Sequence, residues 1–398
     1  MEPRNDKGKL NEMYRLSLLL IFIGIGLIPA YSQEENLTGV ELAFDSDSFA
    51  DGIRESDEVA DRNYTTALRL GIYGAWAEKD YLGLPWVRRK IDGLLLDKLI
   101  ERSGFIQDRK SHNFVLTFNG FTPSLVNDID TSFIQATAGG YDLTNDRPFS
   151  SFTGFRSTRR LEGKKRLVHS AYTYNLAINS SFTFGFASLG IAEGLDDLFQ
   201  GGRPDAILWE RDENRPIPTG QVLPQPLPIF MYSLSGEAVL WQPLRKVLFQ
   251  VRPELNLGYY TNLGIGIDIG KVMNVEKHVD NLGYTDTNNP SLALVNNESI
   301  GLSITGGASI RAVFYDAHLN GLYGSSSGDH FISFSEMRKF QWEGHIGVKL
   351  QLLKKIEITY SFSRRSRGFR GGITRNPIWG TLGLKYLIGE EGEGCYDI

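Results

Sequence analysis

Apolar and polar residues alternate along most of the chain, which is the pattern of β-strands with one apolar and one wet face. In Ile300–Phe314 the even positions are mainly apolar, whereas the odd positions include Ser303 and Arg311. The same alternation marks Thr65–Ala75, Val247–Leu257, Leu263–Ile269, Ile346–Leu352, Ile356–Phe362 and Ile378–Ile388. Further strands are expected at Val40–Phe44, Asn113–Thr122, Phe149–Thr158, Leu167–Ile178, Ser181–Leu189 and Ile229–Trp241. The pattern predicts an all-β fold of about a dozen strands.

The polar face recurs on every predicted strand, and this indicates a wet lumen inside a closed antiparallel barrel. The mean hydropathy of −0.22 is compatible with this, because alternating strands dilute their apolar residues by half. A secreted β-sandwich or a soluble barrel is the alternative. Aromatic residues at positions expected to face lipid favour a transmembrane β-barrel; they are Phe182, Phe184, Phe186, Trp342 and Tyr386.

The N-terminal segment has the layout of a secretory signal peptide. Arg15 precedes the apolar stretch Leu16–Pro29, and the small residues Ala30 and Ser32 follow. This stretch is shorter than the roughly 20 residues of a spanning helix, so we expect cleavage after Ser32. The chain then divides into a signal peptide (1–32), an outer-membrane barrel (33–389) and an acidic, glycine-rich tail (390–398).

Three segments depart from strand patterning. Trp86–Gly104 is predicted to form a short amphipathic helix, and Ile191–Pro228 is a proline-rich insertion outside the barrel that begins with a helix at Glu193–Phe199. Asn274–Glu298 is polar and is expected to be an exposed loop. The helical spacing in the first segment involves Ile91, Leu94, Leu95, Lys98 and Leu99.

Charge and cysteine content narrow the range of functions. The formal net charge is −5 and the sequence pI is about 5.8, whereas nucleic-acid recognition needs a concentrated basic surface. We therefore expect no nucleic-acid partner. The single cysteine, Cys395, has no partner for an internal disulfide, and no protein partner is identifiable.

Several short stretches occur in an order that is found in one enzyme family. Asp45–Phe49 is similar to an Asn-Asp signature, and Asp61–Leu70 to the D-x-x-Y-T strand that follows it. Asp146–Phe149 is similar to a D-R-P-[FY] strand entry. The closing strands are matched by Ile310–Val313, Leu319–Gly321 and Ser361–Phe369. Together these stretches resemble the outer-membrane lipid A deacylase (lipid A 3-O-deacylase) family, of which the chain looks like a divergent member.

This resemblance implies hydrolysis of an acyl ester of lipid A, or lipopolysaccharide, in the outer leaflet. It also implies a barrel of twelve strands, an active site between the wall and a pair of short extracellular helices, and the use of Ca²⁺. Family members use an Asn-Asp pair, a Thr on the next strand, and a His and a Glu on the helical insertion. Here Asp47 matches the aspartate and Thr65 the threonine, while Ser46 stands at the asparagine position and Gln200 at the histidine position.

The substitution at Gln200 matters because ester hydrolysis at neutral pH needs a group that accepts a proton, and an amide does not. The acidic partner is open among Asp205, Glu210 and Asp212. A working deacylase with its base elsewhere is one hypothesis, a catalytically inactive barrel with a lipid-binding or structural role in the envelope is the second, and a diffusion pore is the third. The histidines available as a base are His112, His169, His278, His318, His330 and His345.

Two charged groups each have two interpretations. The carboxylates of Asp45, Asp47 and Asp51 suit a calcium ion, but they also fit a solvated acidic loop that lacks the closing glutamate of an EF-hand. The clusters Arg159–Arg160 and Arg364–Arg367 could hold lipopolysaccharide phosphates in bidentate fashion. Charged strand ends at a membrane interface explain these arginines equally well.

Overall fold

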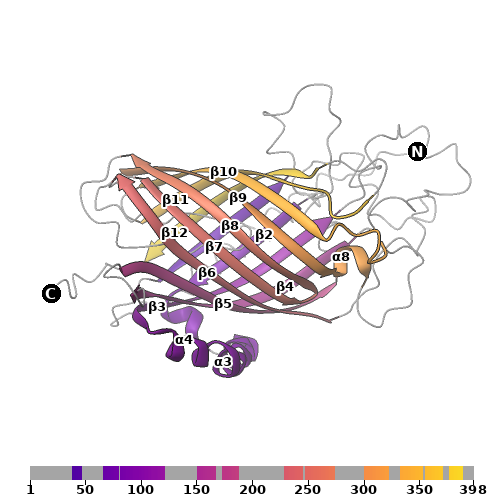
Figure 1. The fold of residues 1–398 in the computed structure, drawn as a ribbon, viewed down its shortest axis with the longest axis horizontal. Helices are drawn as coiled ribbons and strands as arrows, with labels where there is room; N and C mark the ends of the chain where they lie inside the picture. Colours follow the sequence, from indigo (N-terminus) through magenta and orange to yellow (C-terminus); the bar gives the residue numbers. More distant parts are fainter. Residues whose placement is uncertain are drawn as a thin grey trace, which may run out of the picture.

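A computed structural model describes residues 38–46, 66–79, 81–121, 150–166, 173–187, 228–244, 247–273, 300–321, 332–352, 355–370 and 376–388. They form a closed antiparallel β-barrel in which each strand pairs with its neighbours in the sequence and β1 pairs with β12 (Figure 1). The strands are β1 (Thr38–Ser46), β2 (Thr66–Tyr73), β3 (Phe105–Phe121), β4 (Ser150–Arg166), β5 (Thr173–Ala187), β6 (Pro228–Leu244), β7 (Val247–Gly258), β8 (Tyr260–Met273), β9 (Ile300–Asp316), β10 (Phe340–Leu352), β11 (Ile356–Arg365) and β12 (Ile378–Ile388). The predicted fold class is therefore confirmed.

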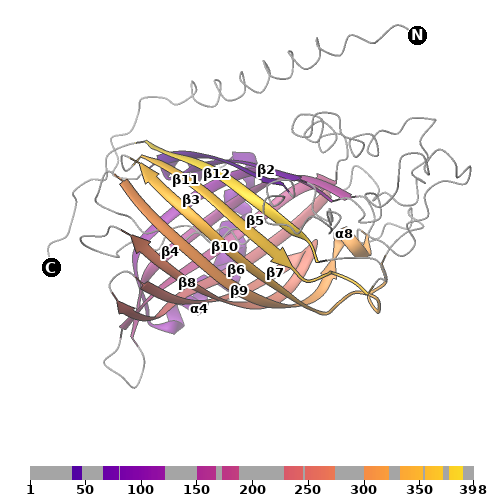
Figure 2. The same ribbon diagram turned by 90° about the horizontal axis from the view of Figure 1, so that it is seen from above.

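The barrel closes in register, with Thr38 opposite Ile388 and Ser46 opposite Gly380. We call the end that holds Thr38 and Ile388 the terminus end. The opposite end carries the short helix α8 (Ala317–Asn320) and is called the α8 end (Figure 2). Because the strands are antiparallel, the connections between them leave alternately from the two ends.

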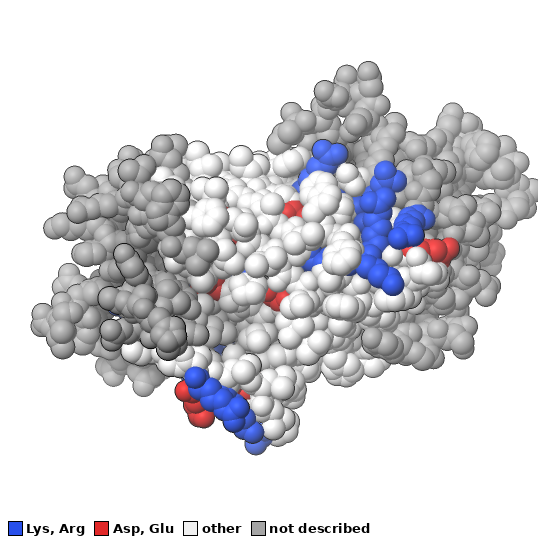
Figure 3. All heavy atoms as spheres, viewed as in Figure 1, with Lys and Arg blue, Asp and Glu red and all other residues white. Residues whose placement is uncertain are grey.

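Burial follows the predicted alternation and gives the barrel a polar lumen. On β7 the even positions are buried polar residues that face the lumen, namely Gln250, Arg252, Glu254 and Asn256. The outward positions are exposed and apolar; examples are Leu263, Ile265, Ile267, Ile269, Ile310, Ile346, Leu382 and Leu384. The middle of the wall accordingly shows few charged atoms (Figure 3). A polar interior inside an apolar belt is the inverse of a soluble protein and is typical of membrane barrels.

The sequence pattern predicted two strands where the structure has one. Leu167–Ile178 and Ser181–Leu189 were expected as separate strands, but a single strand, β5, runs through both. The interpretation failed because Ser180 occupies an outward position where the pattern expects an apolar residue. Ser180 is fully buried there, as a result of contact with a helix outside the wall. Phe182, expected to face lipid, is buried on the same patch.

The connection between β2 and β3 is helical, as predicted. It contains α2 (Ala75–Glu78), the 3₁₀ turn Tyr81–Gly83, α3 (Leu84–Leu95) and α4 (Asp97–Ser103). The helix expected over Trp86–Gly104 is thus two helices, and α4 is followed by Gly104 in the left-handed conformation. Among the described residues, no helix has the length and apolarity needed to span a membrane. The predictions for 1–32, Glu193–Phe199, Asn274–Glu298 and the tail lie outside the described residues.

Gly258 is required at the tight β7–β8 turn. Its φ of +137° lies in a region that residues with a Cβ rarely adopt, and an added Cβ would lie 2.0 Å from the carbonyl oxygen of Phe230. We expect Gly258→Ala to lower the free energy of unfolding by about 2 to 4 kcal/mol, because the backbone must move. Urea titration of the refolded barrel measures this. Gly93→Ala is the control, since its Cβ would meet no atom closer than 3.9 Å; an equal loss in both variants contradicts the prediction.

Candidate functional site

The first two strands end side by side at the α8 end, where Ser46 pairs with Thr66. One step further into the lumen, Arg69 donates a hydrogen bond to the Asp45 carboxylate at 2.8 Å, and both side chains are buried. This ion pair fixes the relative positions of β1 and β2 next to the segment 47–65. Ser46 is the last residue of β1, whereas Asp47 and Thr65 lie outside the described residues.

The topology brings the ends of two candidate segments to the same end of the barrel. The segment 47–65, which carries Asp47 and Thr65, joins β1 to β2 at the α8 end. The segment 188–227, which carries Gln200, joins β5 to β6, and Phe186 opposite Pro228 marks that same end. Gln200 itself lies outside the described residues. The α3 and α4 helices leave from the terminus end, so they are not the helices that the family resemblance places beside the active site.

The described residues do not make a calcium site. No group of three or more His, Cys, Asp or Glu side chains in the described ranges is arranged to hold a metal ion. Asp45, one of the three carboxylates considered for calcium, is instead bound to Arg69 in the lumen. Asp47 and Asp51 lie outside the described residues, so the calcium prediction rests on them.

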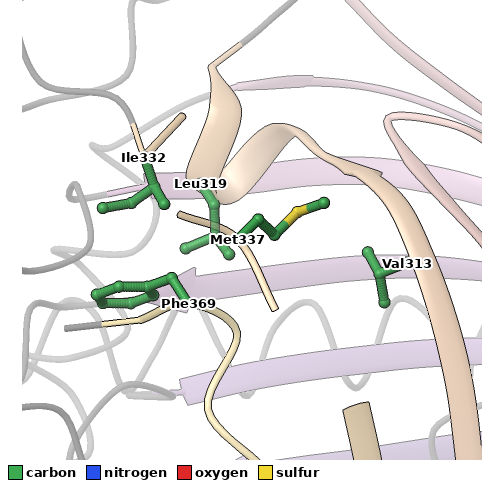
Figure 4. Packing of buried hydrophobic residues seen from close by; sticks show 5 residues of the cluster. All are labelled: Val313, Leu319, Ile332, Met337 and Phe369. Carbon is green, nitrogen blue, oxygen red and sulfur yellow. The ribbon is translucent and has the colours of Figure 1, made fainter. Parts of the chain in front are cut away.

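An apolar cluster lies at the α8 end. Leu319 from α8 and Val313 from β9 belong to one cluster, in which Met337 lies between them (Figure 4). The β9–β10 and β11–β12 connections are joined there by hydrogen bonds from Arg338 N to Gly368 O and from Arg370 N to Glu336 O. The buried members of this cluster are Val313, Leu319, Ile332, Met337 and Phe369.

The described histidines occupy three different environments. His318 on α8 packs edge-on against Phe152, with 4.0 Å between ring centroids, at the same end as Ser46. His345 lies in the lumen with Nε2 3.3 Å from the Asp268 carboxylate, and His112 lies on the outer wall. Of the described histidines, His318 therefore has the position that best suits a general base at the α8 end. His169, His278 and His330 lie outside the described residues.

Ion pairs fill the lumen. Glu343 accepts hydrogen bonds from Arg311 at 2.7 Å and from Arg365 at 2.8 Å, and Arg311 also binds Glu254. Arg160 binds Glu237 at 2.9 Å. These side chains are buried, apart from Arg365, whose side chain is about a quarter exposed. Each of these charges is paired, as burial requires, and the paired side chains project into the lumen.

A second polar cluster lies on the outside of the wall, and the sequence analysis missed it. The Asp92 carboxylate of α3 accepts hydrogen bonds from Ser180 Oγ at 3.0 Å and Tyr232 Oη at 2.9 Å, and lies 3.1 Å from Arg159 Nε. Arg88, also on α3, lies 3.2 Å from His112 Nδ1. We call these residues the outer-wall cluster; they are Arg88, Asp92, His112, Arg159, Ser180 and Tyr232.

A signal for the outer-wall cluster was present in the sequence. His112, Arg159 and Ser180 occupy strand positions whose parity directs them away from the lumen, where apolar residues are expected in a membrane barrel. Arg88 and Asp92 are four residues apart and therefore share one face of a helix. Burial lowers the pKa of Arg88 to about 10, an effect that the Asp92 carboxylate partly offsets. The guanidinium group thus stays charged at neutral pH.

The arginine pair Arg159–Arg160 is bound by carboxylates on both sides of the wall. Arg159 points outward to Asp92 and Asp97, with its Nη2 2.7 Å from the Asp97 carboxylate. Arg160 points inward to Glu237 and Glu162. In the second cluster, Arg365 is bound to Glu343. These three arginines are therefore structural ion-pair partners, and their positions give no support to a phosphate-binding role.

A closed twelve-stranded barrel with a polar lumen and an apolar outer belt defines a transmembrane β-barrel of the outer-membrane type. LpxR from Salmonella typhimurium has a similar fold, with a TM-score of 0.55 and 12% sequence identity over 87% of this chain and 99% of that chain. An outer membrane channel from Pseudomonas putida F1 gives a TM-score of 0.38 at 9% identity, covering 91% and 98% of the two chains. The KdgM porin gives 0.31 at 6% identity, covering 89% and 99%. No family model and no curated protein sequence matches the chain.

Proposed function

We propose that the protein is exported to the bacterial outer membrane and hydrolyses an acyl ester of lipid A in the outer leaflet. The observation that carries this proposal is the convergence at the α8 end. The segments bearing Asp47, Thr65 and Gln200 all start and finish there. These are the residues that the resemblance to lipid A deacylases singles out, and the similarity in fold to LpxR extends over most of the chain.

In this reaction water adds to the ester carbonyl, the acyl C–O bond breaks, and a fatty acid and a sugar hydroxyl are released. Asp47 would orient the reactants, and Thr65 would hold the ester. Gln200 can orient water but cannot remove its proton. A base must therefore come from another residue, and His318 is the described candidate at that end. If calcium takes part, Asp47 and Asp51 are the two carboxylates considered for it that are not bound to Arg69, and it would polarise the ester carbonyl.

A catalytically inactive, lipid-binding barrel is the second candidate, and Gln200 at the position of the expected histidine favours it. A diffusion pore is disfavoured by the ion pairs that occupy the lumen, such as Arg160 with Glu237 and Arg311 with Glu343. Lipid binding without acyl release is therefore the outcome that separates the second candidate from the first.

The test is acyl release from purified lipid A by the refolded barrel, followed by mass spectrometry with calcium and with a chelator. We expect release that is lost in Asp47→Ala and reduced roughly a hundredfold in His318→Gln. Glu101→Ala, on α4 at the terminus end, is the matched control and should keep full activity. Heat modifiability on gels establishes that each variant is folded. A folded protein that releases no acyl chain under either condition would rule out the deacylase and leave the lipid-binding candidate.

A further inference from the structure

The helices α3 and α4, which we call the helix pair, pack on the barrel wall with their polar side inward. In Figure 1 they lie outside the wall, in the part of the barrel nearer the terminus end. Arg88 and Asp92 are fully buried against β3, β4, β5 and β6, through the outer-wall cluster. Leu84 and Leu96 complete the buried stripe at intervals of four residues along the helices. A helix on a soluble protein would bury its apolar side instead.

The apolar side of the helix pair is exposed. Leu94 is 69% exposed, Leu99 is 59% exposed and Trp86 is 54% exposed, and Leu82 and Leu95 extend this surface. Leu94, Leu95 and Leu99 are among the residues whose helical spacing suggested an amphipathic helix, but they point away from the barrel. Like these leucines, the outward positions of the barrel wall are apolar and exposed, as at Ile267 and Ile310.

The exposed charges of the helix pair are mainly basic. Arg89, Lys90, Lys98 and Arg102 are exposed, against Glu101 as the exposed acidic residue of the two helices. The carboxylate of Asp97 is bound to Arg159, and Asp92 is buried with Arg88. The Lys90 ammonium lies 5.9 Å from the Trp86 ring. Tryptophan beside basic residues on an otherwise apolar helix surface is typical of helices that lie in a membrane interface.

The position in the topology indicates which leaflet the helix pair meets. It connects β2 to β3 at the terminus end. Three of the five connections between the described strands at this end are short (167–172, 245–246 and 353–355), whereas five of the six at the α8 end have twelve or more residues. In outer-membrane barrels the short connections face the periplasm. The lipids on that side of a Gram-negative outer membrane are glycerophospholipids, some of which are anionic. Basic residues at the surface of an anionic leaflet are stabilised electrostatically.

We propose that the helix pair is an interfacial anchor that binds the periplasmic leaflet, with its leucines among the acyl chains and its basic residues at anionic phospholipid head groups. This role does not depend on the proposed hydrolysis of lipid A, which is placed at the opposite end of the barrel. The outer-wall cluster holds the helix pair against the wall, and this leaves the apolar side free for lipid.

The first test measures the depth of the helix pair in vesicles. Nitroxide labels are placed at Leu94→Cys and, as a control, at Glu101→Cys, both in a Cys395→Ser background. The barrel is refolded into vesicles of phosphatidylcholine mixed with phosphatidylglycerol. We expect the label at position 94 to be several-fold more accessible to oxygen than to a water-soluble nickel chelate, and the label at 101 to show the reverse. Equal exposure of both labels to the nickel chelate, or close pairing of labels at position 94 between two barrels, would overturn the proposal.

The second test measures lipid preference. A variant that combines Arg89→Gln, Lys90→Gln, Lys98→Gln and Arg102→Gln keeps the outer-wall cluster intact and is compared with the wild-type barrel. Quenching of tryptophan fluorescence by brominated phosphatidylglycerol, relative to brominated phosphatidylcholine, reports the lipid next to the protein. We expect the preference for phosphatidylglycerol to fall roughly tenfold in the variant. An unchanged preference would overturn the role of the basic residues, whatever the outcome of the acyl-release assay.

Discussion

Glu343→Ala is expected to lower the free energy of unfolding by about 2 to 4 kcal/mol, because it removes a buried carboxylate that two guanidinium groups share. Glu343 is 3% exposed and binds both Arg311 and Arg365. Arg311 keeps Glu254 in the variant, whereas the structure shows no second carboxylate within ion-pair distance of Arg365 among the described residues. Urea unfolding in detergent, followed by tryptophan fluorescence, measures the difference.

Two further variants, Glu101→Ala and Glu343→Gln, serve as controls for Glu343→Ala. Glu101→Ala removes an exposed carboxylate and should change the free energy of unfolding by less than about 0.5 kcal/mol. Glu343→Gln keeps the shape and an acceptor oxygen but removes the charge, so its effect should lie between the two. It also provides a folded sample if the alanine variant fails to assemble. A loss in Glu343→Ala no larger than that in Glu101→Ala would show that the lumen ion pairs do not stabilise the barrel.

The alternation of residue types was enough to predict the barrel, because a period of two assigns each residue to the lumen or the lipid side. It placed Arg311 and Lys349 in the lumen and Ile310 and Ile346 outside, as observed. It could not give the partners of the buried charges. Glu343 lies opposite Ser309 in the pairing of β9 with β10, and this register brings it within reach of Arg311. The register depends on the pairing of the whole sheet.

The candidate site was less predictable than the fold. Residue types at Asp47, Thr65, Ser46 and Gln200 came from a resemblance, and strand order then brought the ends of their segments to one end of the barrel. Sequence alone did not reveal that Asp45 pairs with Arg69. The outer-wall cluster was missed for a different reason. Polar residues at outward positions were attributed to a strand break or an interface, although a helix packed outside the wall also explains them.

Removing a carboxylate from the outer-wall cluster is also expected to destabilise the barrel strongly. Asp92→Ala is expected to lower the free energy of unfolding by about 3 to 5 kcal/mol, because the carboxylate is fully buried and joins α3 to three strands. It binds Arg159 on β4, Ser180 on β5 and Tyr232 on β6. Its loss also leaves Arg88 buried without its nearest counter-charge.

The expected consequence is local as well as global, because Asp92 joins α3 directly to the wall. A further polar contact between α3 and the wall runs from Arg88 to His112. Hydrogen exchange of the amides in Leu84–Leu95 should become roughly a hundredfold faster in Asp92→Ala, which corresponds to about 3 kcal/mol of lost local stability. Exchange in β9 and β10, on another part of the wall, should change much less.

The Asp97→Ala variant is the matched control, because Asp97 binds the same guanidinium of Arg159 from a side chain that is 43% exposed. An exposed ion pair contributes at most about 1 kcal/mol, so this variant should exchange nearly as slowly as the wild-type protein. Asp92→Asn should be intermediate, since it keeps an acceptor for Tyr232 but not the charge. If Asp92→Ala and Asp97→Ala exchange alike, burial of polar groups does not hold the helix pair to the wall, and the leucines then hold it there by inserting into the surrounding lipid.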